Sequence, residues 1–184
     1  MASTIDGGIV ISLKGKEKVS SGPLKGVNDH TLQLFLDLAN GTSNGEIDLV
    51  YSKQETGIGA SVTTVYDLAG SLTDLSGTTI TFAEVVLVAI RNRSSTAANR
   101  LHIGPDSSNG FGVEASNKGF WADATDRNVV AADYNSQDGD GSWVILMSRG
   151  GVPVSAGSTD ELAVITQGST SANTWDLLIL GRSS

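Results

Sequence analysis

The chain has 184 residues but no cysteine, and it has only two histidines. Without cysteine there is no disulfide, no thiolate-bound zinc and no cysteine nucleophile, so packing and hydrogen bonds must hold the fold together. His30 and His102 are too few to complete a zinc site by themselves. His102 lies in a Leu-His-Ile triplet, which predicts an outward position on a strand, and His30 follows Asn28-Asp29 in an expected turn. The sequence therefore predicts no catalytic residue and no cofactor, and we expect a protein that is not an enzyme.

Charged side chains are scarce, at 17% of the residues, and positive ones are the rarer kind. The net charge is −8 and the isoelectric point is about 4.6. Nucleic-acid binding depends on neutralising phosphates with cations, so no nucleic-acid partner is expected. No apolar run reaches the roughly 18 residues that a membrane span requires. The first residues also lack the basic and apolar regions of a secretory signal, so we expect a soluble protein made in the cytoplasm, with no membrane partner.

The few cations are unevenly placed. Four lysines lie within the first 25 residues, which carry a net charge of +2, whereas the remainder carries eight cations against eighteen anions, a net charge of −10. Two interpretations stay open. Lysines at a hairpin edge guard against unwanted strand pairing; alternatively, the segment is an arm that lies on an acidic partner, with Lys14, Lys16 and Lys18 as its contact residues.

The chain is rich in glycine, 22 residues, and in short apolar segments separated by turn residues. In Thr31–Leu38, four leucines alternate with other residues, which predicts a half-buried strand, and Asn40-Gly41 and Asn44-Gly45 are expected to form hairpin turns. Ile80–Ile90 is almost continuously apolar and β-branched, which predicts a central strand covered on both faces. Trp143–Met147 is predicted to be a second fully buried strand.

Nine or ten such segments, without interspersed helical patterns, predict the fold class. They favour an all-β, antiparallel β-sandwich of jelly-roll-like type with a short N-terminal arm or hairpin. We assign residues 1–28 to the N-terminal strand and basic segment, which can serve as a contact arm. Residues 29–184 are assigned to the β-sandwich domain, and the two parts are expected to form one compact unit.

One acidic cluster admits a metal-binding interpretation. Asp133, Asp138 and Asp140, together with Asn135, supply the oxygen ligands that calcium prefers. The spacing does not match an EF-hand loop, because the required glycine and the terminal bidentate glutamate are missing. A hairpin turn is the interpretation we adopt, so no metal site is predicted.

Glu84 and the three tryptophans also have two interpretations each. Glu84 lies inside the apolar run, where it is either a buried acid with a perturbed pKa or a carboxylate at a strand edge or subunit contact. Trp121, Trp143 and Trp175 can form a sugar-stacking platform, but two of them begin apolar strands, so we expect core anchors.

Four segments carry a family resemblance: Leu38–Tyr51, Tyr66–Val85, Val152–Val164 and Trp175–Gly181. Their succession resembles a family of small virion proteins of tailed bacteriophages. Several proteins of this kind are capsid decoration or cement proteins, β-sandwiches that sit as trimers on the outer shell and brace neighbouring capsomers. The resemblance implies a structural virion protein on the capsid surface, with the major capsid protein and two further copies of itself as partners.

Two other function classes stay open. A receptor- or glycan-binding module, such as a head fibre or tail tip, would gather exposed aromatic and Asp or Asn side chains at one end of the molecule. A polysaccharide hydrolase would bring two carboxylates together at about 5 to 9.5 Å in a cleft.

Overall fold

The computed structural model describes residues 7–19, 26–74, 76–96, 98–113, 119–132, 142–168 and 172–183; before Leu38 it describes the backbone and its pairing only. These residues form thirteen strands, and every element they form is β-structure. No helix among them is long and apolar enough to cross a membrane. The predicted all-β class is therefore confirmed.

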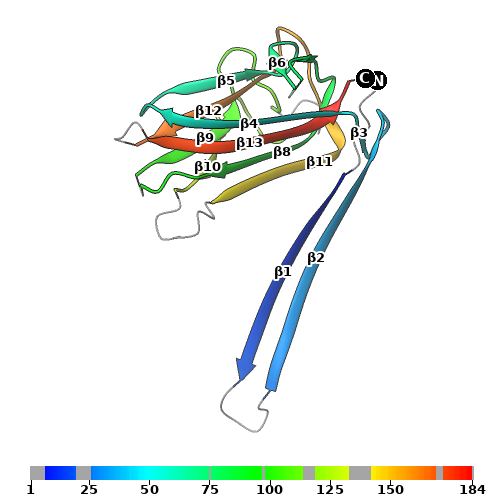
Figure 1. Cartoon of the computed structure of the whole chain (residues 1–184), viewed down its shortest axis with the longest axis vertical. Coiled ribbons are helices and arrows are strands. Elements are labelled where there is room, and N and C mark those ends of the chain that lie inside the picture. Colours follow the sequence, from blue (N-terminus) through cyan, green and yellow to red (C-terminus); the bar gives the residue numbers. More distant parts are fainter. Residues whose placement is uncertain are drawn as a thin grey trace.

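Two four-stranded antiparallel sheets form the body of the protein (Figure 1). The strands of the first sheet lie in the order β11 (Trp143–Pro153), β8 (Glu84–Asn92), β13 (Asn173–Arg182), β4 (Leu49–Ile58). Those of the second sheet lie in the order β10 (Asn128–Val130), β9 (Arg100–Pro105), β12 (Glu161–Gln167), β5 (Thr63–Asp67). A short pair, β6 (Leu72–Thr73) with β7 (Thr79–Ile80), precedes β8.

The connections between the two sheets follow the jelly-roll pattern. From β4 onward, the chain passes from the first sheet to the second and back, so that strands far apart in sequence become neighbours, as β4 and β13 do. With the eight strands lettered B to I in chain order, the two sheets read B-I-D-G and C-H-E-F. This order is the two-Greek-key arrangement of a jelly roll, which agrees with the predicted fold class.

The core lies between the two sheets. Alternate residues of each strand face inward, and the largest fully buried side chains there include Trp175, Phe82 and Phe111. Each such side chain contributes about 1.5 to 3 kcal/mol when it leaves water. Trp121 is also buried, and Gly112 makes room for it: with φ +79°, a Cβ at Gly112 would lie 2.7 Å from Cζ3 of Trp121. Trp121 and Trp175 are thus the core anchors that the sequence predicted.

The two long apolar runs have different positions. β8 lies between β11 and β13, and Val85 to Ile90 are all buried, which confirms a central strand covered on both faces. This strand is shorter than the predicted Ile80–Ile90, because Ile80 belongs to β7 and residues 81–83 lie outside both strands. β11 is instead the edge strand of its sheet, with alternating exposure along Trp143–Met147. The prediction of a second fully buried strand is wrong, because β11 has a neighbour on one side only and its outward face is not fully covered. Pro153 lies at this edge, where its missing N–H costs no ladder hydrogen bond.

The N-terminal part forms a separate antiparallel hairpin of β1 (Gly7–Val19) and β2 (Gly26–Asn40), the arm. Figure 1 shows the arm extending away from both sheets. Its strands are longer than the expected short arm, and the expected division between residues 28 and 29 falls inside β2. β3 (Glu46–Ile47) pairs in parallel with the end of β2 and joins the arm to the body.

Candidate interaction surfaces

The pairing register places the three candidate lysines on one face of the arm. Lys14, Lys16 and Lys18 occupy alternate positions of β1, and Lys16 lies opposite Asp29 of β2. Because successive strand residues alternate between the two faces, the three lysines share a face, which we call the basic face. They belong to the strand itself.

The opposite face of the arm carries aliphatic residues. Ile9, Ile11 and Leu13 of β1 register with Leu36, Leu34 and Leu32 of β2, respectively. The alternation of leucines in β2 was recognised in the sequence, but their partners in β1 were not, since only the hairpin register brings the two sets together. We call these six residues the apolar face of the arm.

The loop at residues 41–45 fixes the direction in which the arm leaves the body. The Gly41 N–H donates to the Ile47 carbonyl at 3.0 Å, and the Glu46 N–H donates to the Ser43 carbonyl at 2.9 Å. The Glu46 side chain accepts from the Ser43 N–H at 2.8 Å. The loop joins strands that run in parallel, so the predicted hairpin turns at Asn40-Gly41 and Asn44-Gly45 are wrong.

Residues 41–45 also spell Gly-Thr-Ser-Asn-Gly, which matches the G-x-S-x-G string of hydrolase nucleophile elbows. In such enzymes the serine stands on a turn between a strand and a helix. Here Ser43 lies between β2 and β3, and its backbone is held by Glu46 and Arg182. The string therefore has a structural explanation at the arm base.

Arg182, at the end of β13, is a fully buried cation that ties the arm base to the first sheet. Its Nη1 donates to the Ser43 carbonyl and its Nη2 to the Gly150 carbonyl, both at 2.7 Å. The guanidinium also forms an ion pair with Glu84. Glu84 thus begins the central strand as the partner of a buried arginine, which accounts for an acid inside an apolar run.

A second apolar cluster lies on the outer face of the first sheet. Leu38 from the end of β2 and Ile47 from β3 cover outward-facing residues of β8 and β13, and all of them are buried: Val86, Leu87, Ala89 and Leu180. Val50 and Leu178 are partly buried against it. The sequence identified Leu38 as an apolar strand residue, but only the tertiary structure shows that it packs on the outside of the sandwich.

The same outer face continues onto β11, where it is uncovered. Trp143, Ile145 and Met147 are 54%, 42% and 38% exposed, and we call them the β11 strip. Met147 lies opposite Leu87, and Trp143 lies opposite Arg91. Trp143 was predicted to be a core anchor; it is exposed because β11 is an edge strand whose outward residues have no covering layer.

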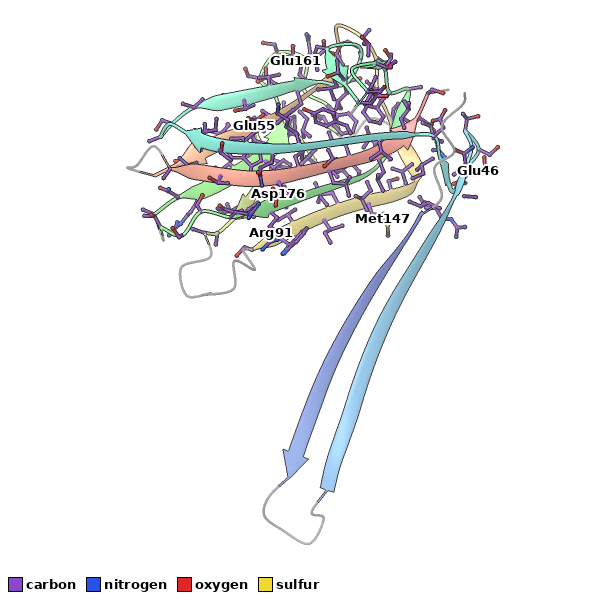
Figure 2. All side chains as sticks on the ribbon, in the orientation of Figure 1. Glu46, Glu55, Arg91, Met147, Glu161 and Asp176 are labelled. Carbon is purple, nitrogen blue, oxygen red and sulfur yellow. The ribbon has the colours of Figure 1, made fainter. Side chains whose placement is uncertain are left out.

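The β11 strip has a polar neighbourhood at its Trp143 end. The guanidinium of Arg91 lies 5.4 Å from the Trp143 ring centroid, a cation–π contact. Asp176 lies opposite Arg91 on β13 and forms an exposed ion pair with Arg93 at 3.5 Å. Figure 2 shows Arg91 and Met147 along the edge of the body that faces the arm, whereas Glu161 lies at the opposite side.

The two histidines lie on strands in different parts of the molecule. His102 lies on β9 between the buried Leu101 and Ile103 and is half-buried, which confirms its predicted outward position on a strand. His30 lies inside β2 opposite Gly15, so the predicted turn at this position is wrong. The hairpin continues past it because β1 supplies a full partner strand.

Three acids lie close together at one end of the paired strands β9 and β12: Asp106 directly follows β9, Asp160 directly precedes β12, and Glu161 begins it. The pKa of the Glu161 carboxyl is raised, mainly by burial and to a lesser extent by the negative charges of Asp106 and Asp160. Asp160 is buried and accepts from the Gly157 N–H at 2.7 Å, while Asp106 accepts from the Ser108 N–H at 3.0 Å. Each of these hydrogen bonds closes a loop, so the carboxylates stabilise turns.

The acidic cluster of Asp133, Asn135, Asp138 and Asp140, for which we expected a hairpin turn, lies outside the described residues. Within the described ranges, no three histidine or acidic side chains are grouped closely enough to hold a metal ion. One shallow hollow of about 220 Å³ lies beside the edge of the sandwich, and its seven lining residues offer hydroxyl and backbone groups but no titratable side chain: Gly112, Val113, Val152, Pro153, Ser155, Ser158 and Thr159.

Comparison of the chain with protein-family models, with curated proteins and with solved structures finds no match.

Proposed function

We propose that this protein is a structural virion protein of a tailed bacteriophage that binds the outer surface of the capsid and stabilises it. The observation that supports this most directly is the arm, which extends away from an acidic body and carries Lys14, Lys16 and Lys18 on one face. A cationic contact surface on an acidic body orients the molecule toward an acidic partner. The major capsid protein is the proposed partner, and the location is the capsid surface.

The architecture suits this role. Jelly rolls serve as viral capsid domains, although they also serve as lectins, so the fold agrees with the proposal by analogy. The hydrogen bonds of the buried Arg182 tie the arm base to the first sheet, and such restraint lowers the conformational entropy lost on binding. A homotrimer, as the resemblance implies, would offer three arms to one shell, and linked contacts raise the apparent affinity through effective concentration.

The test is attachment to particles assembled without this protein. In Lys14→Glu/Lys16→Glu/Lys18→Glu, repulsion replaces attraction on the basic face, and we expect the affinity for particles to fall at least about tenfold, or about 1.4 kcal/mol. Occupancy is measured by co-sedimentation over a range of protein concentrations.

The matched control reverses three exposed cations of the body, Lys53→Glu/Arg93→Glu/Arg100→Glu, and changes the net charge by the same amount. This control should keep most of its affinity. If the wild-type protein and the arm variant occupy the particles equally, the lysines of the arm are not part of the contact. If the arm variant and the control lose affinity equally, the loss results from the change in overall charge.

A glycan- or receptor-binding module is the second candidate. Trp143, more than half exposed and in cation–π contact with Arg91, offers an aromatic platform with a charged group at its rim. In a glycan array, binding that disappears in Trp143→Ala would favour this candidate over capsid attachment.

A further inference from the structure

The apolar outer face of the first sheet is only partly covered within one chain. At one end, Leu38 and Ile47 close it, and the residues beneath are buried. At the β11 strip the cover ends, and three large apolar side chains are exposed. Exposed apolar residues that are contiguous along one face are a candidate interaction surface.

The apolar face of the arm begins where this cover ends. Leu38 belongs to the same face of β2 as Leu36, Leu34 and Leu32, because the four residues alternate along one strand. Leu38 already packs on the outer face of its own sheet. The remaining residues of the apolar face lie farther along the arm, which extends away from the body (Figure 1).

An isolated two-stranded hairpin is marginally stable in water and gains independent stability by packing against another element. The arm therefore needs a cover for its apolar face, and the β11 strip needs one as well. Both surfaces repeat apolar residues at every second position, with a spacing of roughly 6.6 Å between successive positions. The arm cannot cover the strip of its own chain while it extends away from it.

We propose that the apolar face of the arm of one copy packs on the β11 strip of a second copy of this chain. Within one copy, Leu38 packs on the outer face of the first sheet. In the proposed contact, the other apolar residues of the arm pack on the same face of a second copy. It uses different surfaces of each chain, so repetition of the contact builds a closed ring when the rotation closes. The basic face lies on the other side of the arm and is left free for the acidic partner.

The contact itself requires no capsid; the inference rests on the proposed function only where the number of copies in the ring is taken to be three. It is therefore tested on the purified protein without particles. By native mass spectrometry, the wild-type chain should be a closed oligomer, and Ile145→Glu/Met147→Glu should be a monomer. The matched control is Val65→Glu/Val129→Glu, which alters two similarly exposed residues on the outer face of the second sheet and should remain oligomeric.

A second experiment identifies the two surfaces directly. Because the chain has no cysteine, single cysteines can be introduced cleanly. Copies with Met147→Cys are mixed with copies with Leu34→Cys and treated with a short bismaleimide. A crosslink between the two different copies supports the proposal. The proposal would be overturned if no such crosslink forms or if the wild-type chain is a monomer. It would also be overturned if Leu34→Cys/Met147→Cys, which carries both cysteines in one chain, crosslinks within that chain.

The outcomes separate this inference from the proposed function. Monomeric Ile145→Glu/Met147→Glu that still binds particles, only more weakly, supports both. If the oligomer persists in this variant, the inference is overturned. The proposed capsid attachment is not affected by that result, because it is tested separately by the variant Lys14→Glu/Lys16→Glu/Lys18→Glu.

Discussion

At the scale of single residues, the core is held by apolar packing with a few buried hydrogen bonds. Trp175 is fully buried, and its indole N–H donates to the Tyr66 hydroxyl at 3.1 Å, across the interior from β13 to β5. Burial raises the pKa of Tyr66, so its hydroxyl is neutral at physiological pH. This hydrogen bond lets a tryptophan fill the centre of the sandwich without an unpaired donor.

Tyr66→Phe should destabilise the fold by about 1 to 3 kcal/mol, because it leaves the buried indole N–H without an acceptor. Urea denaturation followed by tryptophan fluorescence measures the change. Tyr51→Phe is the control: its ring packs edge-on against Tyr66 at 6.1 Å, but the described residues show no hydrogen bond to its hydroxyl. A Tyr66 variant as stable as the Tyr51 variant would show that the hydrogen bond contributes nothing net.

At the scale of elements, the junction between the arm and the body depends on one side chain. Arg182 of β13 contacts the loop at residues 41–45, the edge strand β11 and the start of β8 at once. A buried arginine requires such partners, because an unpaired cation in the interior is strongly unfavourable. The arm is therefore held by a polar network at its base in addition to the apolar contact of Leu38.

Arg182→Met should destabilise the protein by about 3 kcal/mol, since it removes the donor to the Ser43 and Gly150 carbonyls and leaves Glu84 without its partner. Hydrogen exchange should quicken in residues 41–47 before the rest of the sandwich responds. The comparison is Arg93→Met, whose ion pair with Asp176 is on the surface and should cost less than about 1 kcal/mol. Unchanged exchange at the arm base in the Arg182 variant would contradict this role.

At the scale of the whole molecule, the two faces of the arm are proposed to bind their partners by two different interactions. In the two proposed contacts, the basic face acts through charge, which salt screens, and the apolar face acts through burial, which salt does not weaken. The division follows from strand geometry, because adjacent residues of β1 point to opposite sides.

Raising the salt from about 0.1 M to about 1 M shortens the Debye length from about 10 Å to about 3 Å. We expect this change to release the protein from particles while the oligomer persists. Co-sedimentation reports the first effect and light scattering on the free protein reports the second. An oligomer that dissociates in step with attachment would show that one electrostatic contact supports both.

The local sequence determined the elements of this protein. Turn residues between short β-branched runs indicated a sandwich, the run before Ile90 identified the central strand, and Trp121 and Trp175 were placed correctly in the core. These features depend on neighbours along the chain and on the period of two that every strand shares. The lysines of the arm could be named as candidate contact residues, and their alternate positions along β1 place them on one face; the register with β2 adds which residues lie opposite them.

Only the tertiary structure decided which apolar strand would be covered. Ile80–Ile90 and Trp143–Met147 are both apolar at consecutive positions, yet β8 has a strand on each side and β11 has one side free. Coverage depends on strand order, which is set by contacts between residues far apart in the chain. A local pattern cannot encode that order, because burial belongs to the layers around a strand and not to the strand itself.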